Sequence, residues 1–277
     1  MFGNSRDEQE TPDEQRYVRP MERGDIPAVV AIIYAHDEDD GEEAQDSFEE
    51  TIAGMYVAVD DGQIVGVTGA VRDDETIDIC WLSWTYVDEG RTGEGIGRYL
   101  VNGLLNELKD AGMRKVFIST GDYYEDGVDI YGPAKAFYVK LGAELELKQD
   151  DYYGAGEARY VYGLDLVEPG RTYKSKHMGN LVFDGLHPAP ETDDALSLTW
   201  VEFKSDCPIE NPLEFLEKLI ADARQEKARF ILASIPEDLS AGAISGLKEK
   251  GFSPKGELKD YYGTGVHQLI WQLMIDG

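Results

Sequence analysis

Three glycines that alternate along the chain, Gly93, Gly95 and Gly97, have the spacing of an anion-binding turn. They follow an apolar run predicted as a strand over residues 77–87, and a helix is predicted to start at the last of them. Glycine reaches backbone angles closed to other residues and presents no Cβ to a ligand, so successive N–H groups can point inward at the positive end of the helix. This arrangement suits a pyrophosphate. Glycines at a strand-to-helix turn also serve packing alone, and that alternative stays open.

The spacing excludes two familiar phosphate loops. A dinucleotide fingerprint needs a third glycine where this chain has Arg98, and the Gly-Lys-Ser/Thr of a P-loop is absent. The segment instead resembles the acyl-CoA loop of the GNAT superfamily of acetyl-CoA-dependent N-acetyltransferases, whose signature is Gln/Arg-x-x-Gly-x-Gly/Ala. Residues 92–97 fill its six places, although Thr92 replaces the usual Gln or Arg and Arg91 stands beside it.

Other predicted elements follow the order of that family. A first strand and a helix capped by Asp25 precede a hairpin over residues 56–67, and a buried strand is predicted over residues 115–119. Residues 134–142 match the family helix pattern Ala-x-x-Phe-Tyr-x-x-Leu-Gly. The resemblance covers residues 17–166 and implies an α/β fold of the α+β type, in which helices flank a mixed central sheet.

The resemblance also implies a co-substrate and the residues that bind it. The co-substrate is acetyl-CoA, and no metal is expected. The expected binding residues are those at the end of the strand, in the loop and in the first turn of the helix: Tyr86, Val87, Arg91, Thr92, Gly93, Gly95, Ile96, Gly97 and Arg98.

Tyr138, in the Phe-Tyr pair of the helix pattern, is the predicted catalytic residue. The resemblance implies that it protonates the departing CoA thiolate, and a phenol hydroxyl can do so without being ionised at neutral pH. The general base is not identified, because Leu82 takes the place of the glutamate that some members carry. His36 is interpreted as a surface side chain. Four acidic residues are candidates by location only: Asp78, Asp122, Glu125 and Asp129.

The second half of the chain repeats part of the first. Residues 142–164 align without gaps on residues 251–273, and Asp-Tyr-Tyr-Gly-x-Gly occurs in both. We interpret residues 196–277 as a truncated GNAT-like half-domain without an acyl-CoA loop. At the corresponding helix start, Asn211, Pro212 and Glu214 form a capping arrangement that would oppose a phosphate. Residues 1–16 are predicted as a disordered acidic tail, residues 17–166 as the acetyltransferase domain and residues 167–195 as a linker.

Composition limits the classes of partner. The net charge of −29 argues against binding to nucleic acid and to anionic membranes. The same excess fits either adaptation to salt or a cationic substrate, and composition does not choose between them. No signal peptide and no membrane-spanning run is recognised, so the cytoplasm is the expected location. The two cysteines indicate no disulfide framework.

These observations predict an N-acetyltransferase that moves an acetyl group from acetyl-CoA to a primary amine by direct attack in a ternary complex. Two alternatives remain open at this point. One is a non-catalytic acyl-CoA-binding sensor, suggested by Leu82 and Thr92 and by Tyr131 in place of a usual asparagine. The other is an interaction protein whose function lies in the second half. That half would extend the sheet, cover the substrate cleft or form a homodimer interface.

Overall fold

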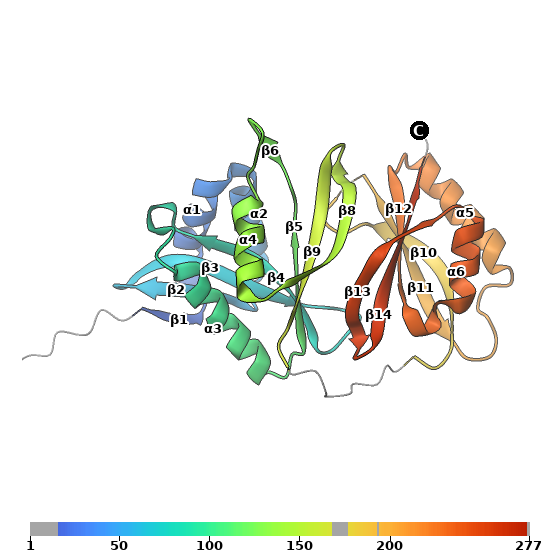
Figure 1. Cartoon of the computed structure of the whole chain (residues 1–277), viewed down its shortest axis with the longest axis horizontal. Helices are drawn as coiled ribbons and strands as arrows, with labels where there is room; N and C mark the ends of the chain where they lie inside the picture. Colours follow the sequence, from blue (N-terminus) through green and yellow to red (C-terminus); the bar gives the residue numbers. More distant parts are fainter. Residues whose placement is uncertain (1–15, 168–176, 193, 276–277) are drawn as a thin grey trace, which may run out of the picture. The chain divides into compact units, whose positions relative to one another are not determined.

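The computed structural model describes residues 16–167, 177–192 and 194–275 and contains two compact units (Figure 1). The first unit comprises the chain up to Val71 together with Cys80–Met113, and the second comprises Arg72–Ile79 together with the chain from Arg114 onward. Apart from Arg16, the predicted N-terminal tail lies outside the described residues. The predicted domain boundaries stay predictions.

The first unit is a sheet with helices on both faces. Its strands follow the order β1-β2-β3-β4. Its elements are β1 (Tyr17–Pro20), α1 (Ile26–His36), α2 (Glu38–Glu50), β2 (Met55–Asp60), β3 (Gln63–Arg72), β4 (Ile79–Val87) and α3 (Ile96–Asp110).

Alternating side chains of β2 build the two cores of this unit. Val57 and Val59 pack in one cluster with buried residues of α1 and α2, whereas Ala58 packs with Ile96 and Leu100 of α3. Successive side chains of a strand point to opposite faces, so the apolar run of β2 reads as a strand covered on both sides. The glycine turn therefore joins a buried strand to a helix that is fixed by its own core.

Asp25 does not cap α1 as predicted. Its carboxylate accepts hydrogen bonds from Arg19 Nη1 at 2.6 Å, from Arg19 Nη2 at 2.9 Å and from the backbone N–H of Glu22 at 2.7 Å, and Asp25 makes no side-chain hydrogen bond to the first turn of α1. The side chain is buried, and the hydrogen bonds from Arg19 hold its pKa below the usual range. A two-pronged arginine partner outcompetes the helix amides for this carboxylate.

The second unit contains two larger sheet portions and the two-stranded sheet β6–β7. One portion runs β5-β9-β8 and is antiparallel, and the other runs β10-β11-β12-β14-β13. Its elements are β5 (Lys115–Thr120), β6 (Tyr124–Glu125), β7 (Val128–Asp129), α4 (Gly132–Leu141), β8 (Glu144–Gly154), β9 (Glu157–Asp165), β10 (Asn180–Pro188), β11 (Leu196–Phe203), α5 (Pro212–Gln225), β12 (Phe230–Pro236), α6 (Ser240–Glu249), β13 (Ser253–Gly263) and β14 (Val266–Met274).

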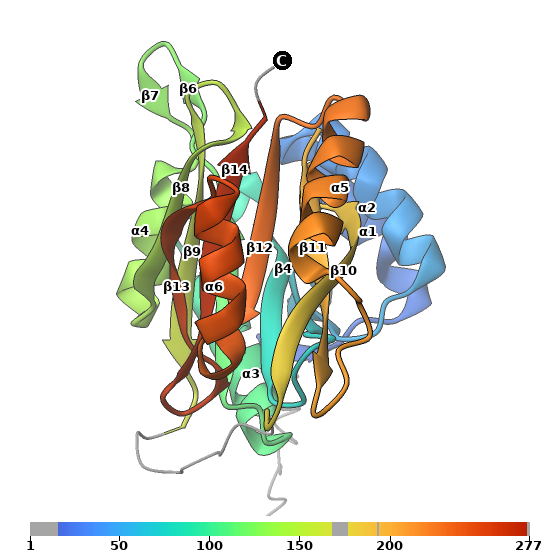
Figure 2. The ribbon, with the colours of Figure 1, turned by 90° about the vertical axis from the view of Figure 1, so that its right-hand side faces the viewer.

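Helices α5 and α6 cover one face of the five-stranded sheet, as Figure 2 shows. Their buried residues, among them Leu216, Ile220 and Leu247, share one cluster with Ile231 of β12 and Trp271 of β14. The expected fold class, a mixed α/β architecture with helices flanking the sheets, is confirmed.

Strand β10 was missed from the sequence. It lies inside the segment assigned to the linker, where glycine, proline and charged residues obscure its pattern. It pairs antiparallel with β11, with a register shift between Phe183 and Gly185. The second half therefore contains one more strand than predicted.

Among the described residues, no helix is both long enough and apolar enough to cross a membrane. Cys80 and Cys207 are both free thiols.

The pKa of Asp25 predicts a specific loss of stability in acid. Because the folded-state pKa lies below the unfolded value near ~4, the Arg19–Asp25 contact stabilises the fold above that value and is lost as the pH falls through the folded pKa. Asp25→Asn should lower the free energy of unfolding by about 1–3 kcal/mol at pH 7, and the gap to wild type should shrink below about pH 4. Urea denaturation between pH 7 and pH 3 measures this gap.

Asp46→Asn on the exposed side of α2 is the matched control, expected to change stability by under about 0.5 kcal/mol. A gap for Asp25→Asn that is independent of pH would contradict the assignment.

Candidate functional site

Strand β4 leads into the glycine loop with a local irregularity. Trp84 has φ +47, a left-handed conformation that is uncommon for a bulky side chain. Its ring contacts the edge of Phe48 with a centroid distance of 5.6 Å, so the conformation is held by packing in the α1–α2 cluster. The irregularity lies three residues before Val87, and such interruptions of a strand are frequent next to functional sites.

The glycines of the loop are required by backbone conformation rather than by close packing. Gly93 has φ +86 and Gly95 has φ +80, angles that other residues rarely adopt. A Cβ at either position would have no described atom within 4 Å. This open space argues against the packing alternative and fits a loop that leaves room for a ligand. Gly97 lies in the first turn of α3.

The N-terminus of α3 has the character of an anion site. Gly95 is the N-cap, and no side chain within the described ranges caps the helix. The first turn closes through the bond from Tyr99 N–H to the Gly95 carbonyl at 3.0 Å. The preceding amides lie at the positive end of the helix dipole, where a phosphate is stabilised.

The corresponding helix of the second half, α5, is capped as predicted. The Asn211 side chain accepts from Glu214 N–H at 3.5 Å and donates to the Glu214 carboxylate at 2.9 Å. This end of α5 therefore holds a carboxylate of its own, which disfavours a phosphate there.

Arginines neutralise the carboxylates around the glycine loop. Arg91 Nη2 donates to Asp60 at 2.6 Å and to Glu94 at 2.7 Å, and Arg16 Nη2 donates to Asp60 at 2.8 Å. The bonds from Arg16 and Arg91 hold the pKa of Asp60 below its usual range, and the bond from Arg91 does the same for Glu94. These contacts fix the loop to the β2–β3 hairpin.

Thr92 also serves the loop itself, because its hydroxyl donates to the Glu89 carbonyl at 3.1 Å. Its predicted role in binding stays a prediction. Arg98 follows in the first turn of α3.

His36 lies against the end of β4, which the sequence did not reveal. Its Nε2 is 2.7 Å from the Val87 carbonyl oxygen, and its ring is 5.5 Å from that of Tyr86. A carbonyl only accepts, so Nε2 carries a hydrogen and donates it. Tyr86 in turn donates its hydroxyl to Asp40 of α2. The interpretation of His36 as a plain surface side chain is therefore incomplete.

Tyr138 belongs to the second unit and lies on α4, which ends at Gly142 with φ +99. It is half-buried, with ring centroids 5.5 Å from Phe137 and 6.4 Å from Tyr162 of β9. The aromatic neighbours restrict the ring without burying it completely. This placement is compatible with the predicted role of its hydroxyl, which stays a prediction.

Three of the four acidic base candidates have structural partners within the second unit. Asp78 pairs with Arg114 at 3.1 Å. Asp122 is buried and accepts from Ala158 N–H at 2.6 Å and from Tyr160 at 3.0 Å. These contacts use the carboxylates to fix strands.

Asp129 is the third candidate with structural partners, and Glu125 is the fourth candidate. Asp129 pairs with Lys135 at 2.5 Å and accepts from Tyr131 N–H at 3.0 Å, so it fixes the start of α4. Glu125 lies exposed on β6. No group of three or more His, Cys, Asp or Glu side chains that could hold a metal occurs in the part of the chain that is described.

The model of the acetyltransferase (GNAT) family matches residues 17–143. Among solved structures, an aminoglycoside 6'-N-acetyltransferase complexed with coenzyme A is 18% identical, with a TM-score of 0.50, over 56% of this chain and 99% of that one. The aminoglycoside 6'-N-acetyltransferase from Enterococcus faecium is 19% identical, with a TM-score of 0.48, over 56% of this chain and 99% of that one. At this identity, the first likeness shows the fold alone. No curated protein matches the chain significantly.

The charge pairs predict that Asp60 controls the rigidity of the loop. Asp60→Asn removes the negative charge to which Arg16 and Arg91 donate hydrogen bonds. The rate of amide hydrogen exchange over residues 91–97 should therefore rise by about fivefold or more, which corresponds to a loss of about 1 kcal/mol in the free energy of local opening. Hydrogen exchange followed by mass spectrometry measures it.

Asp61→Asn is the control, because this neighbour sits in the hairpin turn with φ +51, which asparagine tolerates. Equal exchange in both variants would mean that the ion pairs do not hold the loop.

Proposed function

We propose, from the premise that residues 17–143 form an acetyltransferase domain of the GNAT family, that this acyltransferase moves an acetyl group from acetyl-CoA to a primary amine. The amine attacks the thioester carbon directly within a ternary complex. The carbon–nitrogen bond forms, the carbon–sulfur bond breaks, the amine loses a proton, and the CoA sulfur leaves as a thiolate that takes one up.

The uncapped N-terminus of α3 is the observation that carries this proposal. Gly93 and Gly95 turn the backbone through left-handed angles with open space beside them, and the amides from Gly93 to Arg98 supply donors for a pyrophosphate. Two carboxylates beside the loop, those of Asp60 and Glu94, are paired with Arg16 and Arg91, which reduces the repulsion that an anion meets there in an otherwise acidic protein.

The end of β4 is the proposed site for the acetyl group. The family resemblance assigns the acetyl carbonyl to the backbone near Val87. His36 donates to the Val87 carbonyl, and the Tyr86 ring packs beside it, so both side chains hold this stretch of backbone in place. A fixed backbone donor acts where charge develops on the carbonyl oxygen, as an oxyanion hole does.

Tyr138 is the proposed general acid. Its phenol is half-buried among aromatic rings, and it can give a proton to the developing thiolate while remaining neutral beforehand. The structural roles of Asp78, Asp122 and Asp129 leave no side chain assigned as the base, which fits removal of the amine proton through water.

A cationic amine is the proposed acceptor class. Helix α2 begins with Glu38, Asp39 and Asp40 and carries no basic residue in its last turn, and the whole chain bears a charge of −29. Such a field favours approach of a positively charged acceptor. The identity of the amine, whether small molecule or peptide, is not fixed by these features.

A non-catalytic acyl-CoA sensor is the second candidate. It is favoured by Leu82 at the place of the family glutamate and by the structural partners of the acidic candidates. Binding alone does not separate the two functions, whereas turnover does.

The first test is calorimetric titration of acetyl-CoA into wild type and Gly95→Glu. The substitution puts a side chain and a negative charge at the N-terminus of α3, so the affinity should fall at least about 100-fold, since about 3 kcal/mol is expected from the lost amide contacts and the repulsion.

Gly112→Glu is the matched control. Gly112 follows the other end of α3, has φ +83 and likewise has open space around its Cβ, so both variants carry the same backbone strain. If Gly112→Glu binds acetyl-CoA with wild-type affinity and Gly95→Glu does not, the glycine loop is assigned as the binding site. Absence of binding by folded wild type would sink the proposal.

The second test is turnover by Tyr138→Phe with acetyl-CoA and a panel of cationic amines. Loss of the acid should lower kcat by about 10²–10⁴-fold and leave acetyl-CoA affinity within about twofold. Tyr17→Phe, an exposed position on β1, is the control. Wild-type turnover in Tyr138→Phe would remove the general-acid role, and binding without turnover by wild type would favour the sensor.

A further inference from the structure

The two strand hairpins of the second unit have the same internal register. In the β8–β9 hairpin Glu144 pairs with Gly163 and Gly154 with Glu157, and in the β13–β14 hairpin Ser253 pairs with Gln272 and Gly263 with Val266. Every intermediate pair corresponds, including both register shifts. Register is set by bulges and turn geometry, so this agreement means that the same two irregularities are built into both hairpins.

The irregularity before the turn has the same structure in both hairpins. Asp151 and Asp260 have φ +57 and +55, and each carboxylate accepts from the N–H of the glycine five residues on, Gly156 at 2.7 Å and Gly265 at 2.6 Å. We call residues 151–152 and 260–261 the two bulges. Each leaves backbone carbonyls outside the regular ladder of its hairpin.

An arginine at the start of a central strand is also repeated. Arg114 precedes β5 and Arg229 precedes β12. Each donates its backbone N–H to an aspartate carbonyl at 2.7 Å, that of Asp78 or Asp194 respectively, and each pairs through Nε with the same aspartate, at 3.1 and 2.9 Å. The aspartates orient the two guanidinium groups in the same way.

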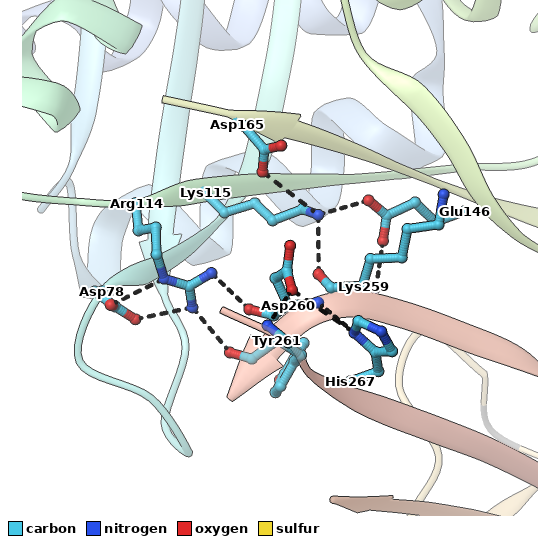
Figure 3. A network of polar contacts seen from close by, with 10 residues as sticks. Asp78, Arg114, Lys115, Glu146, Asp165, Lys259, Asp260, Tyr261 and His267 are labelled. Atoms are coloured by element: carbon cyan, nitrogen blue, oxygen red, sulfur yellow. Dashed lines mark hydrogen bonds and ion pairs between the residues drawn. The ribbon is translucent and has the colours of Figure 1, made fainter. Parts of the chain in front are cut away.

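Each arginine holds the bulge of the other half. Arg114 donates to the carbonyl of Asp260 at 2.6 Å and to that of Tyr261 at 3.2 Å, as Figure 3 shows. Arg229 donates to the carbonyl of Asp151 and to that of Tyr152 at 2.6 Å. The same contact is therefore made twice, once from each half to the other. Such reciprocal contacts define an isologous interface.

The tyrosines after the bulges extend the reciprocity. Tyr153 donates to Glu191 at 2.7 Å, and Tyr262 donates to Glu75 at 2.5 Å. Glu75 lies before β4 and Glu191 before β11, so each carboxylate comes from the half that does not supply the tyrosine.

Equivalent positions also meet one another. Leu147 and Gly256 correspond in the two hairpins, and a Cβ on Gly256 would lie 2.8 Å from Leu147 Cδ1. Contact between a position and its own equivalent occurs at the axis of a two-fold interface.

One part of the interface is not symmetric. Lys115 is buried and donates to Glu146 at 2.6 Å and to the Lys259 carbonyl at 2.9 Å, while Lys259 N–H donates to Glu146 at 2.6 Å (Figure 3). Phe230 follows Arg229 where Lys115 follows Arg114. A buried ion pair that is satisfied by the other half favours pairing of unlike halves over two copies of one.

We propose that residues 180–275 are a built-in partner subunit: they occupy the β8–β9 face that a second copy would otherwise cover, and the chain works as a monomer. The second half then stabilises β8 and β9 of the predicted acetyltransferase domain, as a second copy would in a homodimer. This inference rests on contacts alone and does not depend on acetyl transfer.

The test is cleavage of the intact chain between its halves. A protease site is inserted between residues 167 and 177, the purified protein is cut, and the pieces are followed by size-exclusion chromatography and native mass spectrometry at micromolar concentration. The uncut protein should have the mass of one chain, 30.9 kDa plus that of the inserted site, and the cut pieces should stay together one to one.

Arg114→Ala combined with Arg229→Ala should weaken the association of the cut pieces at least about tenfold. Lys250→Ala, which breaks the surface pair with Glu217 at 3.4 Å, is the control and should change nothing. Separation of the wild-type pieces overturns the proposal, and so does an uncut homodimer that the double arginine variant converts to monomer. Circular dichroism of the uncut variants confirms that they are folded.

Discussion

The packing of the two hairpins in the second unit depends on the hydrogen bonds that Arg114 and Arg229 donate to the bulges. A bulge frees backbone carbonyls from the ladder, and a buried carbonyl without a donor is costly. The two guanidinium groups supply donors in a fixed fork, and Asp78 and Asp194 hold those forks in place. A bulge, an arginine and an aspartate therefore form one hydrogen-bonded arrangement, which occurs twice in this unit. Removing one member leaves the others with unmet hydrogen bonds.

A strongly acidic chain must make a local exception if it is to bind an anionic co-substrate. In the proposed site, the glycine loop would supply backbone amides, which carry no net charge, while Arg16 and Arg91 pair with neighbouring carboxylates. Arg91 pairs with both Asp60 and Glu94, and its predicted role in binding the co-substrate stays a prediction. The second half shows the opposite solution at α5, where Asn211 and Glu214 occupy the helix start. One scaffold thus carries an open helix end and a closed one.

The two halves share some structural features and differ in others. The features shared by both halves are those of packing: hairpin register, bulge, arginine and tyrosines. The features found only in the first half are the glycine loop and the tyrosine of α4, for which the second half has Leu247, fully buried in its core. These differences agree with the proposal that the second half acts as a built-in structural partner.

By itself, the sequence determined the features whose signals are local. The glycine spacing predicted an anion-binding turn at the start of a helix, and Asn211-Pro212 predicted a capped helix start, because turn and cap chemistry act within a few residues. The gap-free match of residues 142–164 with residues 251–273 predicted a structural repeat. Only the tertiary structure decided which distant groups meet. His36 reaches Val87 across 51 positions and Arg114 reaches Tyr261 across 147, and Asp25 turns from its helix to Arg19. Strand β10 escaped for the same reason, since its pairing with β11 outweighs a weak local pattern. Long-range partners are selected by the folded geometry, and no local spacing records them.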